Sequence, residues 1–278
     1  MSASGFAPGR AFAQGAPHVV IIGGGTGGAT AAKYLKLGDE TVKVTIIEQN
    51  QLYQRCYGSN EVLTGYIGMD DITISYDALQ SKYGVDFIFD AVTDVDPDAR
   101  IVRLKSGESV AYDKLIVSPG IDFIWEGTEG YSEEVANSVM PHSWKAGAQT
   151  LLLKSQIDAM PDNGTMVIAP PPNPYRCPPG PYERASLLAE MFMAKKPNAK
   201  ILILDSKDGF AKDQPFMLGW NRLYGSQIPN SKLDGMPDDI NRPEAPGMIE
   251  WVSGSEGGKV TAVDGRSDDR HHRVGRYD

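Results

Sequence analysis

Two cysteines in arginine-rich surroundings are the side chains of this sequence best suited to nucleophilic or redox chemistry. Cys56 follows Arg55 and stands ahead of a possible helix start, whereas Cys177 lies in a proline-rich loop before a predicted helix, with Arg176 and Arg184 nearby. Positive charge and a helix N-terminus both favour the thiolate, the nucleophilic form of cysteine. A small buried hydrophobe is an equally good interpretation of Cys56. The setting of Cys177 favours a redox role over an incidental cysteine in a linker.

A glycine-rich turn is the second feature with a chemical interpretation. The run Gly23-Gly24-Gly25-Thr26-Gly27-Gly28 follows the apolar segment Val19–Ile22 and opens an alanine-rich helical pattern. Gly23 permits a tight turn, Gly25 lets the backbone approach a pyrophosphate, and Gly28 lets the helix pack closely on the strand. The helix N-terminus directs backbone N–H groups and its positive dipole end towards that pyrophosphate.

An acidic residue completes the pattern. Glu48 closes a second predicted strand, Val42–Ile47, twenty positions after Gly28. Its carboxylate can accept hydrogen bonds from ribose hydroxyls and would repel a 2′-phosphate, so it favours the adenosine diphosphate moiety of FAD or NAD over NADP. The combination predicts a Rossmann-like domain rather than a glycine loop that serves only tight packing. The predicted cofactor-binding residues of this turn and strand are Gly23, Gly25, Thr26, Gly28 and Glu48.

Composition limits the alternatives. The 278 residues, 41% of them hydrophobic, can build one large or two ordinary domains. A net charge of −9 argues against a nucleic-acid partner, and no apolar run approaches the roughly 20 residues of a membrane helix. Two cysteines provide no disulfide framework. His271-His272 lack spaced carboxylate or cysteine partners, so no metal site is predicted.

The segment after the first βαβ pattern reads as further strands. Val85–Phe89, Ile101–Leu104 and Tyr112–Val117 resemble an antiparallel insertion bounded by Asp-Pro and Ser-Gly turns. The last of these strands ends in a short turn at Gly120, a pattern that returns the chain to the first sheet near a flavin in two-dinucleotide-domain flavoproteins. This pattern makes Gly120 a candidate cofactor-binding residue. An ordinary strand and turn would look similar.

A second α/β unit follows, without a second glycine fingerprint. The pattern predicts a helix at Ser143–Met160, a strand at Thr165–Ala169, a helix at Tyr182–Lys195 and a strand at Lys200–Leu204. Where a pyridine-nucleotide domain would place its glycines, the run 169–181 contains seven prolines. Proline removes backbone donors and stiffens the loop, which suits phosphate binding poorly. A pyridine-nucleotide-dependent reductase is therefore a disfavoured hypothesis.

The sequence resembles the flavoprotein subunit of flavocytochrome c sulfide dehydrogenase, a family related to sulfide:quinone oxidoreductases and to glutathione-reductase-like flavoproteins. The resemblance spans about Pro17–Gly265. It rests on four motifs in order: G-G-G-T-G-G-A-T-A-A-K-Y at Gly23–Tyr34, C-Y-G-S-N-E-V at Cys56–Val62, W-K-A-G at Trp144–Gly147 and R-C-P-P-G-P-Y-E-R-A-S at Arg176–Ser186.

The resemblance implies a periplasmic FAD enzyme that oxidises sulfide to sulfur or polysulfide and passes electrons to a c-type cytochrome subunit. It implies that Cys56 is the covalent anchor of the flavin and that Cys177 is the catalytic cysteine, one of two that form a redox disulfide. A sulfide:quinone oxidoreductase-like enzyme and a truncated, non-catalytic FAD-binding fragment remain alternatives.

Four regions are predicted. Residues 1–17 are a signal remnant or disordered extension, because Ala11-Phe12-Ala13 resembles a cleavage site. Residues 18–141 form the first segment of the FAD-binding domain, and 142–265 form a second, interleaved nucleotide-binding-like α/β domain. Residues 266–278 form an irregular tail that departs from the family pattern, which predicts a C-terminally truncated or frameshifted chain lacking the second redox cysteine.

Overall fold

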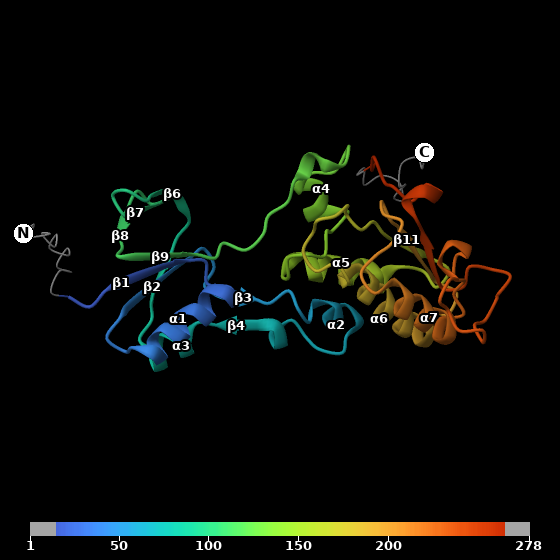
Figure 1. Ribbon diagram of the computed structural model, residues 1–278, viewed down its shortest axis with the longest axis horizontal. Helices are drawn as coiled ribbons and strands as arrows, with labels where there is room; N and C mark the ends of the chain where they lie inside the picture. Colours follow the sequence, from blue (N-terminus) through green and yellow to red (C-terminus); the bar gives the residue numbers. More distant parts are fainter. Residues whose placement is uncertain (1–14, 265–278) are drawn as a thin grey trace, which may run out of the picture. The chain divides into compact units, whose positions relative to one another are not determined.

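The computed structural model describes residues 15–264 of the chain, so the predicted signal-like segment, the tail and His271-His272 lie outside the described residues. The chain divides into two compact units (Figure 1). Unit 1 contains the chain up to Tyr53 together with Thr73–Asp122, and unit 2 contains Gln54–Ile72 together with the chain from Phe123 onward. The units therefore divide differently from the predicted boundary at residue 141. Within residues 15–264 no helix has the length and apolar character needed to cross a bilayer.

Unit 1 is built on a parallel four-stranded sheet of order β5-β2-β1-β9. Its strands are β1 (His18–Ile22), β2 (Lys43–Glu48), β5 (Asp86–Phe89) and β9 (Lys114–Val117), with helices α1 (Thr26–Gly38) and α3 (Asp77–Tyr83). The two central strands are apolar over successive residues, and Val20, Ile21 and Ile46 are fully buried. Continuous apolar runs of this kind are typical of parallel strands that are covered on both faces. The predicted β–α–β order of the fingerprint region is confirmed.

The antiparallel interpretation of the following segment was wrong for two of its three strands. β5 runs parallel to β2, with Phe87 opposite Ile46, and β9 runs parallel to β1, with Ile116 opposite Ile21. Local alternation does not define strand direction, which is set by the crossover connections. The antiparallel sheet consists instead of β6 (Val92–Asp96), β7 (Ile101–Leu104) and β8 (Ser109–Ala111). The expected return of the chain to the first sheet before Gly120 is confirmed by the β1–β9 pairing.

Unit 2 contains a second parallel sheet, of order β10-β11-β12. Its strands are β10 (Thr165–Ile168), β11 (Lys200–Leu204) and β12 (Ile249–Val252), and its helices are α2 (Ser59–Thr64), α4 (Glu133–Ser138), α5 (Ala148–Ala159), α6 (Gly180–Lys195) and α7 (Asp213–Tyr224). The predicted β10–α6–β11 order is confirmed, whereas α7 and β12 were not predicted. Tyr182, Leu188 and Phe192 of α6 are fully buried against Ile201 and Ile203 of β11.

The helix predicted to start at Ser143 begins only at Ala148, and that boundary was wrong. Ser143 has φ +59° and Gly147 has φ +120°, both outside the right-handed helical region. The Gly147 N–H donates to Thr150 Oγ1 at 3.3 Å, which provides a partner for a backbone group at the helix start.

Residues 54–72 belong to unit 2 because Leu63 of α2 shares an apolar core with Leu153 of α5 and Leu188 of α6. Short strands β3 (Leu52–Gln54) and β4 (Thr73–Ser75) pair with each other where the chain enters and leaves this segment. The remaining described elements are 3-10 turns at Asp70–Ile72, Trp125–Gly127, Asn230–Lys232 and Gly254–Glu256.

Candidate functional site

The glycine turn of unit 1 has the geometry that the fingerprint predicts. Gly23 has φ +94°, and a Cβ atom there would lie 2.1 Å from the Ser118 carbonyl oxygen. A Cβ atom on Gly28 would lie 1.8 Å from the Gly23 carbonyl oxygen. Only glycine fits at these two positions, because any side chain would force helix α1 away from the turn that follows β1.

Glu48 lies against this turn from the end of β2. Its Oε2 accepts a hydrogen bond from the Gly24 N–H at 2.7 Å, and its Oε1 accepts from the Asn50 N–H at 2.9 Å. The neighbouring Tyr76 side chain is 4% exposed, and its buried hydroxyl has no hydrogen-bond partner among the described residues. Burial, and secondarily the charge of Glu48, raises the pKa of Tyr76, so this hydroxyl stays protonated.

The start of helix α1 is suited to a phosphate group. Gly25 is the N-cap, no side chain caps the helix, and its first turn contains no acidic residue. A Cβ on Gly25 would meet only the Tyr53 ring, at 3.4 Å, so the backbone can be approached closely. Tyr53 in turn shares a hydrogen bond of 2.8 Å between its hydroxyl and Thr26 Oγ1. Backbone donors, a dipole end and an orphaned hydroxyl together fit the diphosphate and ribose groups of a dinucleotide.

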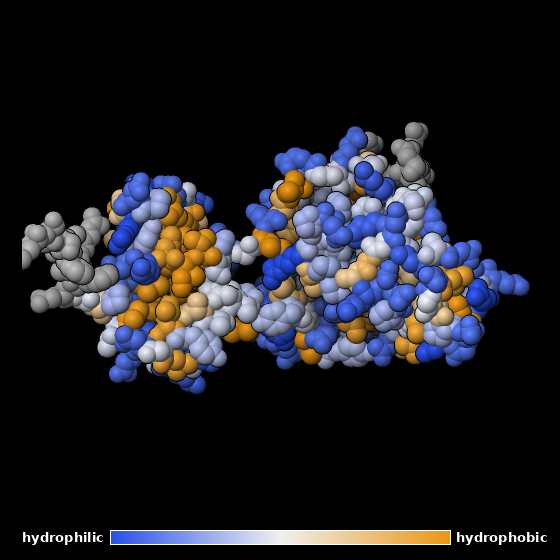
Figure 2. All heavy atoms as spheres, viewed as in Figure 1, coloured by the Kyte–Doolittle hydropathy of each residue, from blue (hydrophilic) through white to orange (hydrophobic). Residues whose placement is uncertain are grey.

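The carboxyl edge of the same sheet also presents apolar side chains. Phe89 at the end of β5 is 42% exposed and Val117 at the end of β9 is 63% exposed, and Figure 2 shows an apolar area on the surface of unit 1. Gly120 follows with φ +85° and open space around it. Ligands of parallel α/β sheets bind outside this edge, and apolar lining suits an aromatic ring system.

In unit 2, Arg176, the residue before Cys177, contacts the sulfur of Cys56. The Arg176 Nη2 lies 3.5 Å from Cys56 Sγ, although the two residues are 120 positions apart. Cys56 is half-buried, and its carbonyl accepts hydrogen bonds from the Ser59 N–H (3.1 Å) and hydroxyl (2.6 Å). These bonds hold the thiol-bearing residue at the start of α2.

Arg55, the sequence neighbour of Cys56, does not supply the charge at this thiol. Its Nη1 donates to the Tyr57 carbonyl at 2.6 Å and its Nη2 donates to the Asp71 carbonyl at 3.2 Å. The guanidinium that contacts the Cys56 sulfur is that of Arg176, and sequence adjacency could not reveal this.

Cys177 is exposed and lies in the loop just before α6, which begins at Gly180 rather than at the predicted Tyr182. It has φ +57°, and its carbonyl accepts from the Gly180 N–H at 2.9 Å. An atom placed at the Cβ position of Gly180 would lie 3.2 Å from Cys177 Sγ and 3.4 Å from the Trp144 ring. The absence of a side chain at Gly180 therefore leaves the thiol and the indole next to each other over the first turn of the helix.

Asp205 follows β11 at the position in the second βαβ pattern that Glu48 occupies in the first. It is fully buried, and its Oδ2 accepts from Tyr182 Oη at 2.5 Å and from Trp251 Nε1 at 3.1 Å. Its Oδ1 pairs with Lys207 Nζ at 2.5 Å. Because Asp205 is fully buried and both of its carboxylate oxygens are paired within the protein, this acid is not presented to a ribose.

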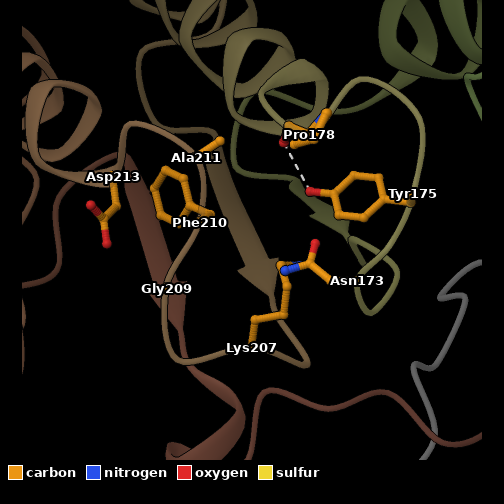
Figure 3. A pocket seen from close by; sticks show the side chains of 8 residues that line it. All are labelled: Asn173, Tyr175, Pro178, Lys207, Gly209, Phe210, Ala211 and Asp213. Carbon is orange, nitrogen blue, oxygen red and sulfur yellow. Dashed lines mark hydrogen bonds between the residues drawn. The ribbon is translucent and has the colours of Figure 1, made fainter.

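Lys207, the ion-pair partner of Asp205, lines a cavity of about 460 Å³ (Figure 3). The rings of Tyr175 and Phe210 border it, and the Tyr175 hydroxyl donates to the Pro178 carbonyl at 2.8 Å. The proline loop thus supplies an aromatic wall where a glycine fingerprint would supply N–H donors. Its lining residues are Asn173, Tyr175, Pro178, Lys207, Gly209, Phe210, Ala211 and Asp213.

The fold and these sites define an α/β protein with two dinucleotide-type units, of which the first retains the features of a dinucleotide site. Residues 17–145 match the family described as pyridine nucleotide-disulphide oxidoreductase. Residues 150–276 match the central region of the sulfide dehydrogenase [flavocytochrome c] flavoprotein chain. The chain belongs to the pyridine nucleotide-disulphide oxidoreductase family.

Individual relatives agree with this assignment. The chain is 31% identical over 118 residues to the sulfide-quinone reductase of Aquifex aeolicus, which is 42% of this chain and 27% of that protein. It is 44% identical over 48 residues to the sulfide dehydrogenase [flavocytochrome c] flavoprotein chain of Chlorobaculum thiosulfatiphilum, which is 17% of this chain and all of that sequence. The solved structure of the Aquifex aeolicus sulfide:quinone oxidoreductase has a TM-score of 0.61 at 23% identity, covering 86% of this chain and 51% of that one. The chain thus spans about a quarter of the first relative's length and half of that solved chain.

Proposed function

We propose that the chain is the FAD-binding and thiol-bearing part of a sulfide-oxidising flavoenzyme of the flavocytochrome c sulfide dehydrogenase type. The observation that carries the proposal is the divergence of the two units. Unit 1 keeps the glycine turn and an acid directed at it, whereas unit 2 replaces the fingerprint with a proline loop that bears Cys177. The match of residues 150–276 to that enzyme's central region supports the same assignment.

FAD is the dinucleotide we propose for unit 1. The N–H groups at the start of α1 would bind the diphosphate, and Gly23, Gly25, Thr26 and Gly28 would shape that site. Glu48 would exchange its hydrogen bond with Gly24 for one to a ribose hydroxyl, and the orphaned Tyr76 hydroxyl lies beside the same carboxylate. When bound, FAD would supply a two-electron acceptor that can pass electrons on one at a time.

The two thiols take separate roles in this proposal. Cys56 would anchor the flavin covalently, and the Arg176 Nη2 lies 3.5 Å from its sulfur. The sequence holds no other free cysteine for this role, so Cys177 would form its disulfide with a second cysteine from outside this sequence. Hydrosulfide would attack the Cys177 sulfur of that disulfide, so that a new sulfur–sulfur bond forms on Cys177, the disulfide breaks and the second cysteine leaves as a thiolate. The exposure of Cys177 and its place just before a helix N-terminus suit that chemistry. Gly120, on the open turn after β9, would lie near the flavin.

The electron acceptor that we propose is a c-type cytochrome subunit in the periplasm, with sulfur or polysulfide as the product. A sulfide:quinone oxidoreductase-like enzyme is the second candidate, favoured by the identity with the Aquifex aeolicus reductase over 118 residues. A pyridine nucleotide is not a proposed reductant, because Asp205 is committed to Tyr182, Trp251 and Lys207.

The experiment that tests the proposal begins with the chain purified with FAD and separated on a denaturing gel under ultraviolet light. We expect fluorescence at the position of the protein, and mass spectrometry should place the adduct on the peptide containing Cys56. The variant Cys56→Ser should still bind FAD but lose the fluorescent band. A chain that never retains FAD, covalently or otherwise, would contradict the assignment of unit 1.

A sulfide titration separates the enzymatic alternatives from a non-catalytic FAD-binding fragment. Loss of the yellow flavin absorbance on anaerobic addition of sulfide, with reoxidation by cytochrome c faster than by a short-chain quinone, is the expected result. The reverse order of acceptors would favour the quinone-linked enzyme. Bound FAD that sulfide does not bleach would favour the non-catalytic fragment.

A further inference from the structure

Arg184 is a buried cation without a carboxylate partner. Its side chain lies inside unit 2, since the residue is 6% exposed, and its Nη2 donates to the Ser143 carbonyl at 2.9 Å. Its Nε is buried and makes no hydrogen bond with any described residue, and no described carboxylate oxygen lies within ion-pair distance of it. The adjacent Glu183 accepts instead from Asn60 Nδ2 at 3.0 Å. A guanidinium buried in this way is unfavourable unless an anion is placed beside it.

Besides the adjacent Glu183, whose carboxylate is hydrogen-bonded to Asn60, the Cys177 thiol is a group near Arg184 that can become an anion. Arg184 lies one helical turn after Gly180 on the same face of α6, and Cys177 Sγ lies over Gly180. The Trp144 ring adjoins both, since the Arg184 guanidinium carbon is 6.0 Å from its centroid. Burial lowers the pKa of Arg184 to about 10, and the negative charges of Glu183 and of a Cys177 thiolate oppose that shift.

We propose that the buried guanidinium of Arg184 stabilises an anionic sulfur on Cys177. That sulfur is a monoanion, either the thiolate or a persulfide. The persulfide part rests on the proposed function, whereas the thiolate part needs neither FAD nor sulfide. Arg184 acts through Cys177 and is therefore a positioning residue.

Other charges around the thiol must be accounted for in a pH-dependent test. Burial lowers the pKa of His142 to about 4, and its Nδ1 accepts from the Trp144 N–H at 3.0 Å, so His142 is neutral near pH 7. Burial raises the pKa of Tyr175, so this phenol is also neutral there. Titratable and charged groups also face this region from α6, the proline loop, β11 with the residues after it, and the segment before α5. They are Glu183, Arg184, Tyr182, Tyr175, Arg176, Asp205, Lys207, His142 and Lys145.

The test measures alkylation of Cys177 by iodoacetamide, a neutral reagent, across a range of pH. The chain has two cysteines, so the variant Cys56→Ser leaves Cys177 as the single reactive thiol. In this background Arg184→Met should lower the rate near neutral pH about five- to tenfold and move the midpoint of the pH profile upward. Arg184→Lys, which keeps the charge, should stay within about threefold of the parent.

A purely structural role for Arg184 gives a different pattern. In that case Arg184→Met would reduce the unfolding midpoint and leave the pH profile of alkylation unchanged, which would overturn the proposal. The four tryptophans, Trp125, Trp144, Trp220 and Trp251, all belong to unit 2, so their emission shows whether each variant is folded there.

A second measurement keeps the proposal testable if Arg184→Met does not fold. The stability of the Cys56→Ser chain should rise with pH where Cys177 ionises beside Arg184, and adding Cys177→Ser should abolish that rise. Equal pH dependence in the two chains would refute the proposal. Because neither measurement uses flavin or sulfide, failure here leaves the flavin-attachment test unaffected.

Discussion

Replacing Gly28 by alanine tests whether close approach of α1 to the preceding turn is what forms the proposed FAD site. The new Cβ would lie 1.8 Å from the Gly23 carbonyl oxygen and 3.2 Å from Ile21 Cγ2. Because the first contact is with backbone, relief requires a shift of more than about 1 Å in the helix or the turn, and overpacking of this kind costs about 1–3 kcal/mol or more. Alanine also gains up to about 1 kcal/mol of helix propensity. The net of these two effects is an expected loss of about 1–2 kcal/mol in the stability of unit 1.

The matched control is Gly38→Ala at the other end of the same helix. A Cβ on Gly38 meets no atom within 4 Å, so we expect a change within about 0.5 kcal/mol. For a domain of about 100 residues, the loss in Gly28→Ala corresponds to a fall of roughly 10 °C in the unfolding midpoint of unit 1.

The assay can distinguish the two units. Since the tryptophans lie in unit 2, the Gly28→Ala effect should be seen by far-ultraviolet circular dichroism and not in the tryptophan-monitored midpoint. Titration with FAD should show at least about tenfold weaker binding, because the N–H groups at the start of α1 move with the helix. Wild-type stability together with wild-type FAD affinity in Gly28→Ala would refute the reasoning.

Two further predictions concern the interior of unit 2. Because burial lowers the pKa of His142 to about 4 in the folded state, the unfolded chain binds a proton first as the pH falls. Stability should therefore be complete above about pH 6.5 and decrease by about 1–2 kcal/mol towards pH 4, whereas His142→Asn, whose Oδ1 can accept from Trp144, should lack this decrease in tryptophan-monitored urea unfolding. Tyr182→Phe removes a hydroxyl that donates to the fully buried Asp205 and should cost about 1–3 kcal/mol in the same assay. Burial and Asp205 raise the pKa of Tyr182, so the parent should lose stability above about pH 10 more steeply than Tyr182→Phe, and equal slopes would contradict this assignment.

The elements that could be predicted from sequence are those whose determinants are local. The β1–α1–β2 segment is specified by an apolar run, a glycine turn and a helical pattern that are contiguous, and β11 was predicted with the residues Lys200–Leu204 that the structure shows. The direction of β5 and β9 was mispredicted because it depends on which distant strand each one joins. Helix α5 was started too early because its apolar pattern extends upstream of Gly147, while the positive φ of Ser143 has no distinct sequence signal.

The residues around the thiols show the same limit. The sequence placed the charge of Arg55 beside Cys56, but Arg55 binds carbonyl groups and Arg176 supplies the contact. That contact depends on packing α2 beside the proline loop, which no local pattern encodes. The missing carboxylate partner of Arg184 is likewise a property of the folded interior, because sequence shows the charge and not its burial.

Glu48 and Asp205 occupy similar places in the two β–α–β units but differ in burial and in their hydrogen-bond partners. Glu48 is the last residue of β2, and Asp205 directly follows β11, so both acids lie at the end of the second strand of a β–α–β unit. Glu48 is only partly buried and is hydrogen-bonded to backbone N–H groups, so ligand hydroxyls can compete for its oxygens. Asp205 is fully buried beneath Tyr182 and Trp251, and displacing either donor would leave an unpaired group in the core. Nucleotide binding in unit 2 would thus require disruption of its core. Because the loop after β10 need not hold a pyrophosphate, it can instead hold Cys177 just before α6.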